Sequence, residues 1–184
     1  MTVKNRIVFV LATTLAICAG YAGYLLNVPS RQESSRSVQI VQPALGEHAL
    51  TYWSFSDLEG QERQMTEWAG QVVLINFWAT WCGPCRNEIP SFVALQSRYA
   101  DAGVQFVGVA LDRPQAVTEF AEQYAINYPL LIGEENVAQY MRALGNKIGA
   151  LPFSALIDRS GNVIETHQGE WKEVDVENLI ARSL

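Results

Sequence analysis

Cysteine and histidine are scarce in this sequence, whose 184 residues include three cysteines and two histidines. A small domain held together by several disulfides needs more cysteines, and most metal sites built from several protein ligands need more cysteine and histidine side chains. Basic residues are also few, 13 Lys and Arg against 19 Asp and Glu, so the formal net charge is −6. Because a nucleic-acid surface needs a basic stripe, we expect no nucleic-acid partner.

Charged residues are absent from one long stretch, residues 7–26, which reads IVFVLATTLAICAGYAGYLL. A helix of this length, at about 1.5 Å per residue, can cross a hydrocarbon core of about 30 Å. Lys4 and Arg6 precede the run, and positive residues in this position stay on the cytoplasmic side. We therefore expect residues 1–26 to be a membrane anchor, with the rest of the chain exported.

A cleaved signal peptide is the alternative interpretation of the same segment. Signal peptides have a shorter apolar region and small residues at the cleavage site, and the residues around Gly20 and Ala22 match such a site imperfectly. A lipoprotein-type cleavage before Cys18 requires a small preceding residue, and this chain has the bulky Ile17 there. We expect Cys18 to be a small apolar residue of the anchor, and lipid modification is the alternative.

The polar stretch that follows has no apolar periodicity, and we expect residues 27–44 to form a flexible linker. Residues 45–184 then form the folded domain, which is long enough to bury a core. From Val38 onward the chain carries 9 basic and 18 acidic residues, a net charge of −9. This part of the sequence contains no internal repeat or low-complexity segment, so we expect one globular unit.

Strand and helix patterns alternate along the domain. Apolar runs predict strands at 51–55, 71–79, 103–111, 129–133, 153–158 and 162–168, and helical patterns appear at 84–100, 114–124, 136–144 and 173–183. Turn residues at 57–60 predict an N-terminal β-hairpin, and those at 159–161 predict a second hairpin. Strands that alternate with helices and end in a hairpin and a terminal helix predict an α/β fold, with a mixed central sheet flanked by helices.

Two cysteines, Cys82 and Cys85, follow the first buried strand in the sequence WCGPC. One turn of helix brings both sulfurs within disulfide distance. The first thiol lies at the helix N-terminus, where free N–H groups and the helix dipole favour the thiolate that attacks disulfides. We therefore expect Cys82 to be the nucleophile and Cys85 to resolve the mixed disulfide, with no cofactor besides this redox-active pair.

Three other roles for a CxxC pair fit the sequence less well. A zinc site needs two further ligands, and Cys18, His48 and His167 are the candidates left. Haem attachment needs a histidine directly after the second cysteine, where this chain has Arg86. A structural disulfide closing so short a loop would restrict the unfolded chain little. Both histidines are isolated, so we expect neither to be catalytic.

Glu88 falls on the same face of the predicted helix as Cys85. Steps of three and four residues connect Cys85, Glu88, Phe92, Leu95 and Tyr99, and the last three form an apolar stripe. A carboxylate near a buried thiol can accept and return its proton, and burial would raise the pKa of that carboxylate toward neutrality. We expect Glu88 to have this role; the alternative is an ordinary glutamate near the helix start, stabilised by the helix dipole.

The segment FWATWCGPC, residues 77–85, resembles the active site of thioredoxins. The domain as a whole resembles the membrane-anchored thioredoxin-like proteins of the TlpA, ResA and DsbE/CcmG type. An FxDLxG-like hairpin at 55–60, the Asn76–Glu88 segment and an extra, inserted strand–helix unit at 103–125 carry this resemblance. Thioredoxins proper have a buried aspartate where this chain has Asn76, whereas the ResA-like group has a glutamate at the position of Glu88.

This resemblance implies an exported thiol–disulfide oxidoreductase with a thioredoxin-like fold, tethered by one helix to the bacterial inner membrane with its catalytic domain on the periplasmic side. Its implied partners are exported disulfide-containing proteins, apocytochrome c among them, a membrane thiol electron donor, and the lipid bilayer through the anchor. Trp81, Pro84, Leu151 and Pro152 match positions that bind substrate in the family, and the matching proline is cis. Gly83-Pro84 between the cysteines, as in reducing thioredoxins, implies a reductase.

Two other functions occur on related folds. A peroxidase of the peroxiredoxin type uses a threonine three residues before its reactive cysteine, and this chain has Ala79 there, with Thr80 adjacent. A copper metallochaperone on this fold uses a CxxxC pair and a distant histidine, whereas two residues separate the cysteines here. Both functions are alternatives to disulfide exchange.

Overall fold

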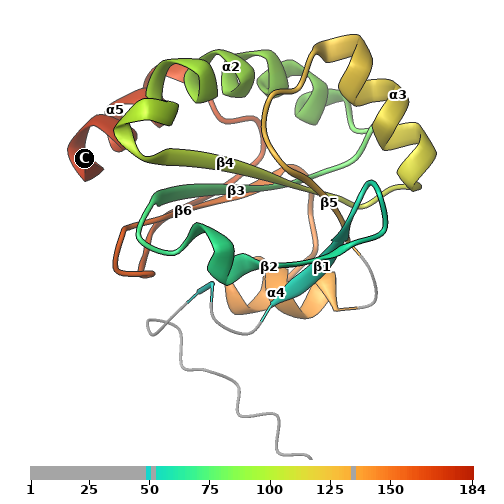
Figure 1. The fold of residues 1–184 in the computed structure, drawn as a ribbon, viewed down its shortest axis with the longest axis horizontal. Helices are drawn as coiled ribbons and strands as arrows, with labels where there is room; N and C mark the ends of the chain where they lie inside the picture. The colour runs from blue at the N-terminus through green and yellow to red at the C-terminus, as the bar shows by residue number, and fades with distance from the viewer. Residues whose placement is uncertain (1–48, 51–52, 134–135) are drawn as a thin grey trace, which may run out of the picture. The chain divides into compact units, whose positions relative to one another are not determined.

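The computed structural model describes residues 49–50, 53–133 and 136–184 of the chain, as Figure 1 shows. The expected anchor at 1–26, the expected linker at 27–44 and His48 lie outside the described residues. In the part of the chain that is described, no helix is both long and apolar enough to cross a membrane. The described residues belong to the domain expected at 45–184.

A seven-stranded sheet has the order β2-β1-β5-β4-β3-β6-β7. Its strands are β1 (Ser54–Asp57), β2 (Glu62–Gln64), β3 (Val72–Trp78), β4 (Val104–Ala110), β5 (Leu130–Ile132), β6 (Phe153–Ile157) and β7 (Val163–Gln168). The central strands β3, β4 and β5 are parallel. The pairs β1–β2, β1–β5, β3–β6 and β6–β7 are antiparallel, so the expected mixed sheet is confirmed.

β3 is buried along its whole length, with the sequence VVLINFW. Valine, isoleucine and aromatic residues favour strands, and a strand covered on both faces has a continuous apolar run instead of an alternating one. Because successive side chains of a strand point to opposite faces, Leu74 and Trp78 belong to one core and Ile75 and Phe77 to another.

The helices cover both faces of this sheet. They are α2 (Gly83–Tyr99), α3 (Pro114–Tyr124), α4 (Val137–Ala143) and α5 (Glu173–Ser183), with two short 3-10 helices, η1 (Met65–Trp68) and η2 (Ala100–Ala102). Figure 1 shows α2, α3 and α5 over one face and α4 on the opposite face. This arrangement confirms the α/β fold with helices on both sides of the sheet, and β4 with α3 forms the expected extra strand–helix unit.

The N-terminal hairpin differs from its expected boundaries. The strand expected at 51–55 begins at Ser54 in the described residues and continues to Asp57, which the sequence pattern assigned to the turn. The side chain of Asp57 accepts hydrogen bonds from the backbone N–H groups of Glu59 at 3.1 Å and Gln61 at 2.8 Å. Asp57 is therefore both the last residue of the strand and the residue that caps the turn. The turn propensity of aspartate predicts the second role but not the first.

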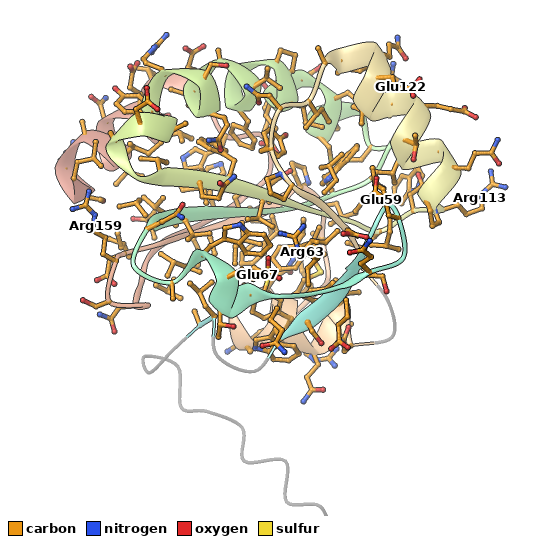
Figure 2. All side chains as sticks on the ribbon, viewed as in Figure 1. Glu59, Arg63, Glu67, Arg113, Glu122 and Arg159 are labelled. Carbon is orange, nitrogen blue, oxygen red and sulfur yellow. A yellow bond between two sulfur atoms is a disulfide. The ribbon has the colours of Figure 1, made fainter. Side chains whose placement is uncertain are left out.

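Charged side chains connect neighbouring segments at the surface, where Figure 2 labels several of them. Arg63 on β2 pairs with Glu67 on η1, with Nη2 and Oε2 2.6 Å apart, and the hydrogen bond from Arg63 lowers the pKa of Glu67. Arg159, in the β6–β7 turn, donates to the carbonyl of Ala102 at 3.1 Å. These contacts lie away from the cysteines and serve the scaffold.

Candidate active site

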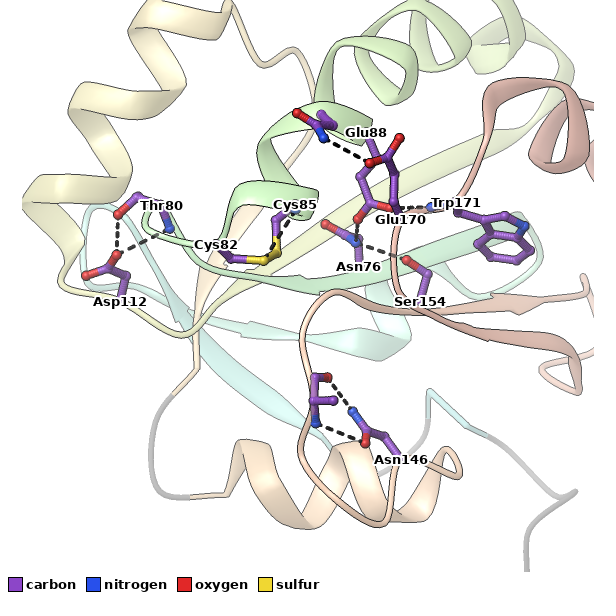
Figure 3. The surroundings of a disulfide bond; sticks show 12 residues. Asn76, Thr80, Cys82, Cys85, Glu88, Asp112, Asn146, Ser154, Glu170 and Trp171 are labelled. Carbon is purple, nitrogen blue, oxygen red and sulfur yellow. Dashed lines mark hydrogen bonds between the residues drawn. A yellow bond between two sulfur atoms is a disulfide. The ribbon is translucent and has the colours of Figure 1, made fainter.

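The junction between β3 and α2 places Cys82 at the N-cap of α2 and Cys85 in its first turn (Figure 3). Pro84 also lies in the first turn, where its missing N–H costs no helical hydrogen bond. Cys82 and Cys85 form a disulfide, with their Cα atoms 5.3 Å apart. The Sγ of Cys82 accepts a hydrogen bond from the backbone N–H of Cys85 at 3.3 Å, so it faces the free N–H groups that would stabilise a thiolate.

The two sulfur-bearing residues differ in exposure. Cys82 is 6% exposed, whereas Cys85 is fully buried. Trp81, directly before Cys82, is 70% exposed, and Pro84 is exposed as well. A partner protein can therefore approach Cys82 past an apolar surface, whereas Cys85 depends on groups inside the domain for its proton.

Glu88 lies one turn after Cys85 on α2 and is 2% exposed. Its Oε1 accepts a hydrogen bond from Nδ2 of Asn76 at 2.7 Å, and its Oε2 accepts one from the backbone N–H of Trp171 at 2.8 Å. The same Nδ2 of Asn76 donates to Oγ of Ser154 at 2.9 Å. This network, visible in Figure 3, holds the carboxylate between β3, β6 and the segment before α5.

Burial raises the pKa of Glu88 to about 7. The hydrogen bonds from Trp171 and Asn76 stabilise the charged form but do not outweigh burial, and the negative charge of Glu170 adds to the increase. A carboxyl group with such a pKa can accept and release a proton near neutral pH. Cys85 and Glu88 are three residues apart on α2, a spacing that places neighbouring side chains on one helix face. The geometry fits the acid–base role expected of Glu88, which stays a prediction.

The peptide bond between Leu151 and Pro152 is cis, as the family resemblance implied. Pro152 directly precedes β6, whose Phe153 pairs with Phe77 near the carboxyl end of β3. Pro152 is buried, and its carbonyl accepts a hydrogen bond from the backbone N–H of Gly169 at 2.9 Å. The sheet thus brings the proline to the end of β3 that leads into the cysteines, and the expected substrate contacts stay predictions.

A tight turn connects β3 to Cys82. It is closed by a hydrogen bond from the backbone N–H of Cys82 to the carbonyl of Ala79 at 3.1 Å. Within this turn, Thr80 donates both its hydroxyl and its backbone N–H to Oδ2 of Asp112, in the loop after β4. Partial burial acts to raise the pKa of Asp112, but the hydrogen bonds from Thr80 and the backbone of Arg113 outweigh it and hold that pKa below its usual value.

Four residues around the cysteines were not identified as partners from the sequence: Asn76, Asp112, Ser154 and Trp171. Asn76 is the polar residue inside the apolar run of β3, and this interruption is a signal that could have indicated a buried partner for Glu88. Trp171 contributes a backbone N–H, which no side-chain pattern reveals. Asp112 and Ser154 are distant from the cysteines in sequence, so only the fold brings them to the site.

His167, on β7, stacks on Trp171 with ring centroids 5.0 Å apart. Its Nε2 lies 3.2 Å from the carbonyl oxygen of Glu170. These contacts belong to a side chain packed beside the segment that holds Glu88. Among the described residues, no group of three or more His, Cys, Asp or Glu side chains is placed to hold a metal ion.

Three kinds of comparison with known proteins give consistent results. The Redoxin family profile matches residues 40–181. The thiol-disulfide oxidoreductase ResA of Geobacillus thermodenitrificans is 36% identical over 122 residues, which cover 66% of this chain and 68% of the relative. ResA of Bacillus thuringiensis (strain Al Hakam) is 30% identical over 182 residues, 97% of each chain. The crystal structure of a thioredoxin-family thiol:disulfide interchange protein from Chlorobium tepidum TLS has a TM-score of 0.68 and 28% identity, and covers 75% of this chain and 96% of that one.

Proposed function

Since the chain belongs to the redoxin family, as a thiol–disulfide oxidoreductase of the thioredoxin-like TlpA, ResA and DsbE type, we propose that it reduces disulfides in exported proteins from a membrane tether. The observation that carries the chemistry is the Cys82–Cys85 pair at the N-terminus of α2. One sulfur of this pair faces free N–H groups, and the other is buried one turn from Glu88.

The reduced pair acts in two exchange steps. The Cys82 thiolate attacks one sulfur of a substrate disulfide, a mixed disulfide forms, and the first substrate thiolate leaves. Cys85 then loses its proton to Glu88 and attacks the sulfur of Cys82, and the second substrate thiolate leaves. Two electrons pass from the protein's thiols to the substrate, and the protein ends in the disulfide form. The proton on Glu88 returns to a departing thiolate, so Glu88 is ready for another cycle.

The proposed direction of exchange is supported by the residues between the cysteines. Gly83-Pro84 lacks the histidine with which strong oxidants of this fold stabilise the thiolate, so the disulfide form is favoured. We expect a reduction potential nearer to about −270 mV than to about −120 mV, a gap of about 7 kcal/mol for two electrons. Equilibration of the protein with glutathione buffers measures it, and a value above about −150 mV would make the protein an oxidase instead.

The proposed place of action is supported by the uncharged stretch at 7–26 and the positive residues before it. A retained anchor would hold the catalytic domain on the periplasmic side of the inner membrane, where a reductase needs a membrane thiol donor to return it to the dithiol form. Protease added to spheroplasts should digest the domain while cytoplasmic markers stay intact. Protection of the domain from the protease would contradict this topology.

The substrates on this proposal are exported proteins with a reducible disulfide, with apocytochrome c as one candidate. A Cys85→Ser variant should accumulate mixed disulfides through Cys82, because the thiol that resolves them is missing. Reductant releases the trapped partners from these complexes, and mass spectrometry identifies them. Cys82→Ser is the matched control and should trap none. Equal trapping by both variants, or complexes made of cytoplasmic proteins alone, would contradict the proposal.

A further inference from the structure

We propose that Asp112 is a positioning residue for the nucleophile: through Thr80, it holds the turn that delivers Cys82 to the N-terminus of α2. This role rests on the proposed exchange chemistry of the Cys82–Cys85 pair, which follows β3, and adds a residue from the loop after the neighbouring strand β4. Asp112 follows β4, and the carboxyl ends of β3 and β4 lie side by side, because Trp78 and Ala110 are paired in the parallel register. A backbone hydrogen bond from Leu111 to the carbonyl of Trp78, at 2.8 Å, extends this pairing to the edge of the site.

The ends of the turn at 79–82 and its middle are held in different ways. Ala79 and Cys82, at the two ends, are buried in the core, and a backbone hydrogen bond from Cys82 to Ala79 closes the turn. In the middle, Trp81 is 70% exposed, whereas Thr80 is hydrogen-bonded to the loop after β4. Both its hydroxyl and its N–H are bound by one carboxylate oxygen of Asp112, as Figure 3 shows.

The carboxylate is itself fixed. Its second oxygen, Oδ1, accepts a hydrogen bond from the backbone N–H of Arg113 at 2.8 Å, at the residue that precedes α3. The same hydrogen bonds keep the pKa of Asp112 low, so the group is charged at neutral pH and its bonds to Thr80 are charge-assisted. Asp112 thus connects the start of α3 to the turn before the nucleophile.

Loss of this connection would let Cys82 drift from the N–H of Cys85, which its sulfur faces at 3.3 Å. A thiol that leaves a helix N-terminus loses stabilisation of its thiolate, so its pKa rises and its reactivity at neutral pH falls. If Asp112 acted only through its charge, its loss would change the pKa of Cys82 in the opposite direction. Removal of a negative charge near the site would favour the thiolate and speed its reaction. The sign of the effect therefore separates the two roles.

The test is a double-mutant cycle on the reduced full chain. The variants are Asp112→Ala, Thr80→Val and the double mutant, and the readout is the rate of Cys82 alkylation by iodoacetamide as a function of pH. We expect each single mutant to raise the pKa of Cys82 and to slow alkylation at pH 7 by about three- to tenfold, because small displacements of a reactive group are costly. The double mutant should be no slower than either single mutant, because each single mutation already removes the same connection between Thr80 and Asp112.

Two further variants separate positioning from folding. Thr80→Ser keeps both donors and should react within about twofold of the wild type. Asp158→Ala removes a carboxylate that binds the backbone N–H groups of Ser160 and Asn162 in the β6–β7 turn, so it should lower the melting temperature without changing alkylation. Faster alkylation in Asp112→Ala, or additive effects in the double mutant, would overturn the positioning role. A wild-type chain that exchanges no disulfides would refute the exchange chemistry itself, a separate result.

Discussion

The two faces of the central sheet are both closed by helices, but their cores differ in chemistry. The face under α4 is apolar, and its rings gather on the buried Tyr140, whose centroid lies 4.6 Å from that of Trp53 and 5.6 Å from that of Phe77. The face under α2 and α5 buries Asn76 and Glu88 among its apolar side chains. One strand serves both, because neighbouring residues of β3 point to opposite faces.

This difference shows where the domain accepts an energetic cost. Burial of a carboxyl group disfavours its charged form, and the pKa of Glu88 rises to about 7 for that reason. An apolar side chain at the position of Glu88 would avoid this penalty, as the α4 face does throughout its aromatic cluster. The face under α2 and α5 therefore gives up stability at the position from which Glu88 would accept the proton of Cys85 in the proposed exchange.

The largest expected effect is on the apolar face. Ile75 is fully buried one residue before Asn76 and points to the opposite side. Ile75→Ala should lower the free energy of unfolding by about 2–5 kcal/mol, because it leaves a cavity in a packed core. Urea denaturation measures the loss, and Ile75→Val, as a control, should cost about 0.5–1.5 kcal/mol. If Ile75→Ala instead slowed exchange without loss of stability, the division between the two faces would fail.

The next effect is the pH dependence that Glu88 gives to stability. Its pKa in the folded state, about 7, lies above the ordinary value of 4.5, so the folded state binds more protons between these pH values. The contribution of Glu88 to stability should therefore be full below pH 4.5 and be lost, by up to about 3 kcal/mol, as pH rises through 7. Asp112 and Asp158 have lowered pKa values, so the stability that they contribute is lost only as pH falls below this range.

Glu88→Gln should remove this pH dependence and be more stable than the wild type above pH 7. Gln should be tolerated because Oδ1 of Asn76, which has no hydrogen-bond partner among the described residues, can accept from the new amide once the Asn76 side chain rotates. Urea denaturation at about pH 5 and pH 8 gives the comparison, with the exposed Glu165→Gln as the matched control. A constant difference between Glu88→Gln and the wild type at both pH values would show that Glu88 does not titrate in this range.

The smallest effect is expected at Ser154, which accepts a hydrogen bond from Asn76. Ser154→Ala leaves one N–H of that amide unpaired in the interior, which should cost about 1–2 kcal/mol of unfolding free energy. Ser160→Ala, at the exposed hairpin turn, should change stability by less than about 0.5 kcal/mol. Equal stability of the two variants would mean that the network adjusts freely around Asn76.

The sequence contained enough information for the sheet, the helices and the cysteine pair. The apolar run of β3 and the helical spacing of Cys85, Glu88 and Phe92 predicted which residues are buried, because periodicity reflects burial directly. The cis bond before Pro152 was implied by resemblance alone, since nothing local to the sequence requires it.

The partners of Glu88 and Thr80 could not be predicted in the same way. Trp171 approaches Glu88 through its backbone, and Asp112 reaches Thr80 because parallel strands end side by side. Such contacts depend on which distant segments the fold brings together, and a pattern along the sequence does not contain that information. The end of β1 at Asp57 was missed for a related reason, since Asp57 has turn propensity but pairs within the strand.

The most direct test of the central claim, that Glu88 takes the proton of Cys85, isolates the resolving step. Reduced full chain reacts with an aromatic disulfide to form a mixed disulfide at Cys82, and release of the second coloured thiolate reports the attack by Cys85. In the wild type this rate should rise with pH through an inflection near pH 7, the pKa of Glu88. In Glu88→Gln the inflection should vanish and the rate should fall by about 10- to 100-fold. An unchanged rate and pH profile between about pH 6 and 8 would contradict the claim and leave Glu88 a structural residue.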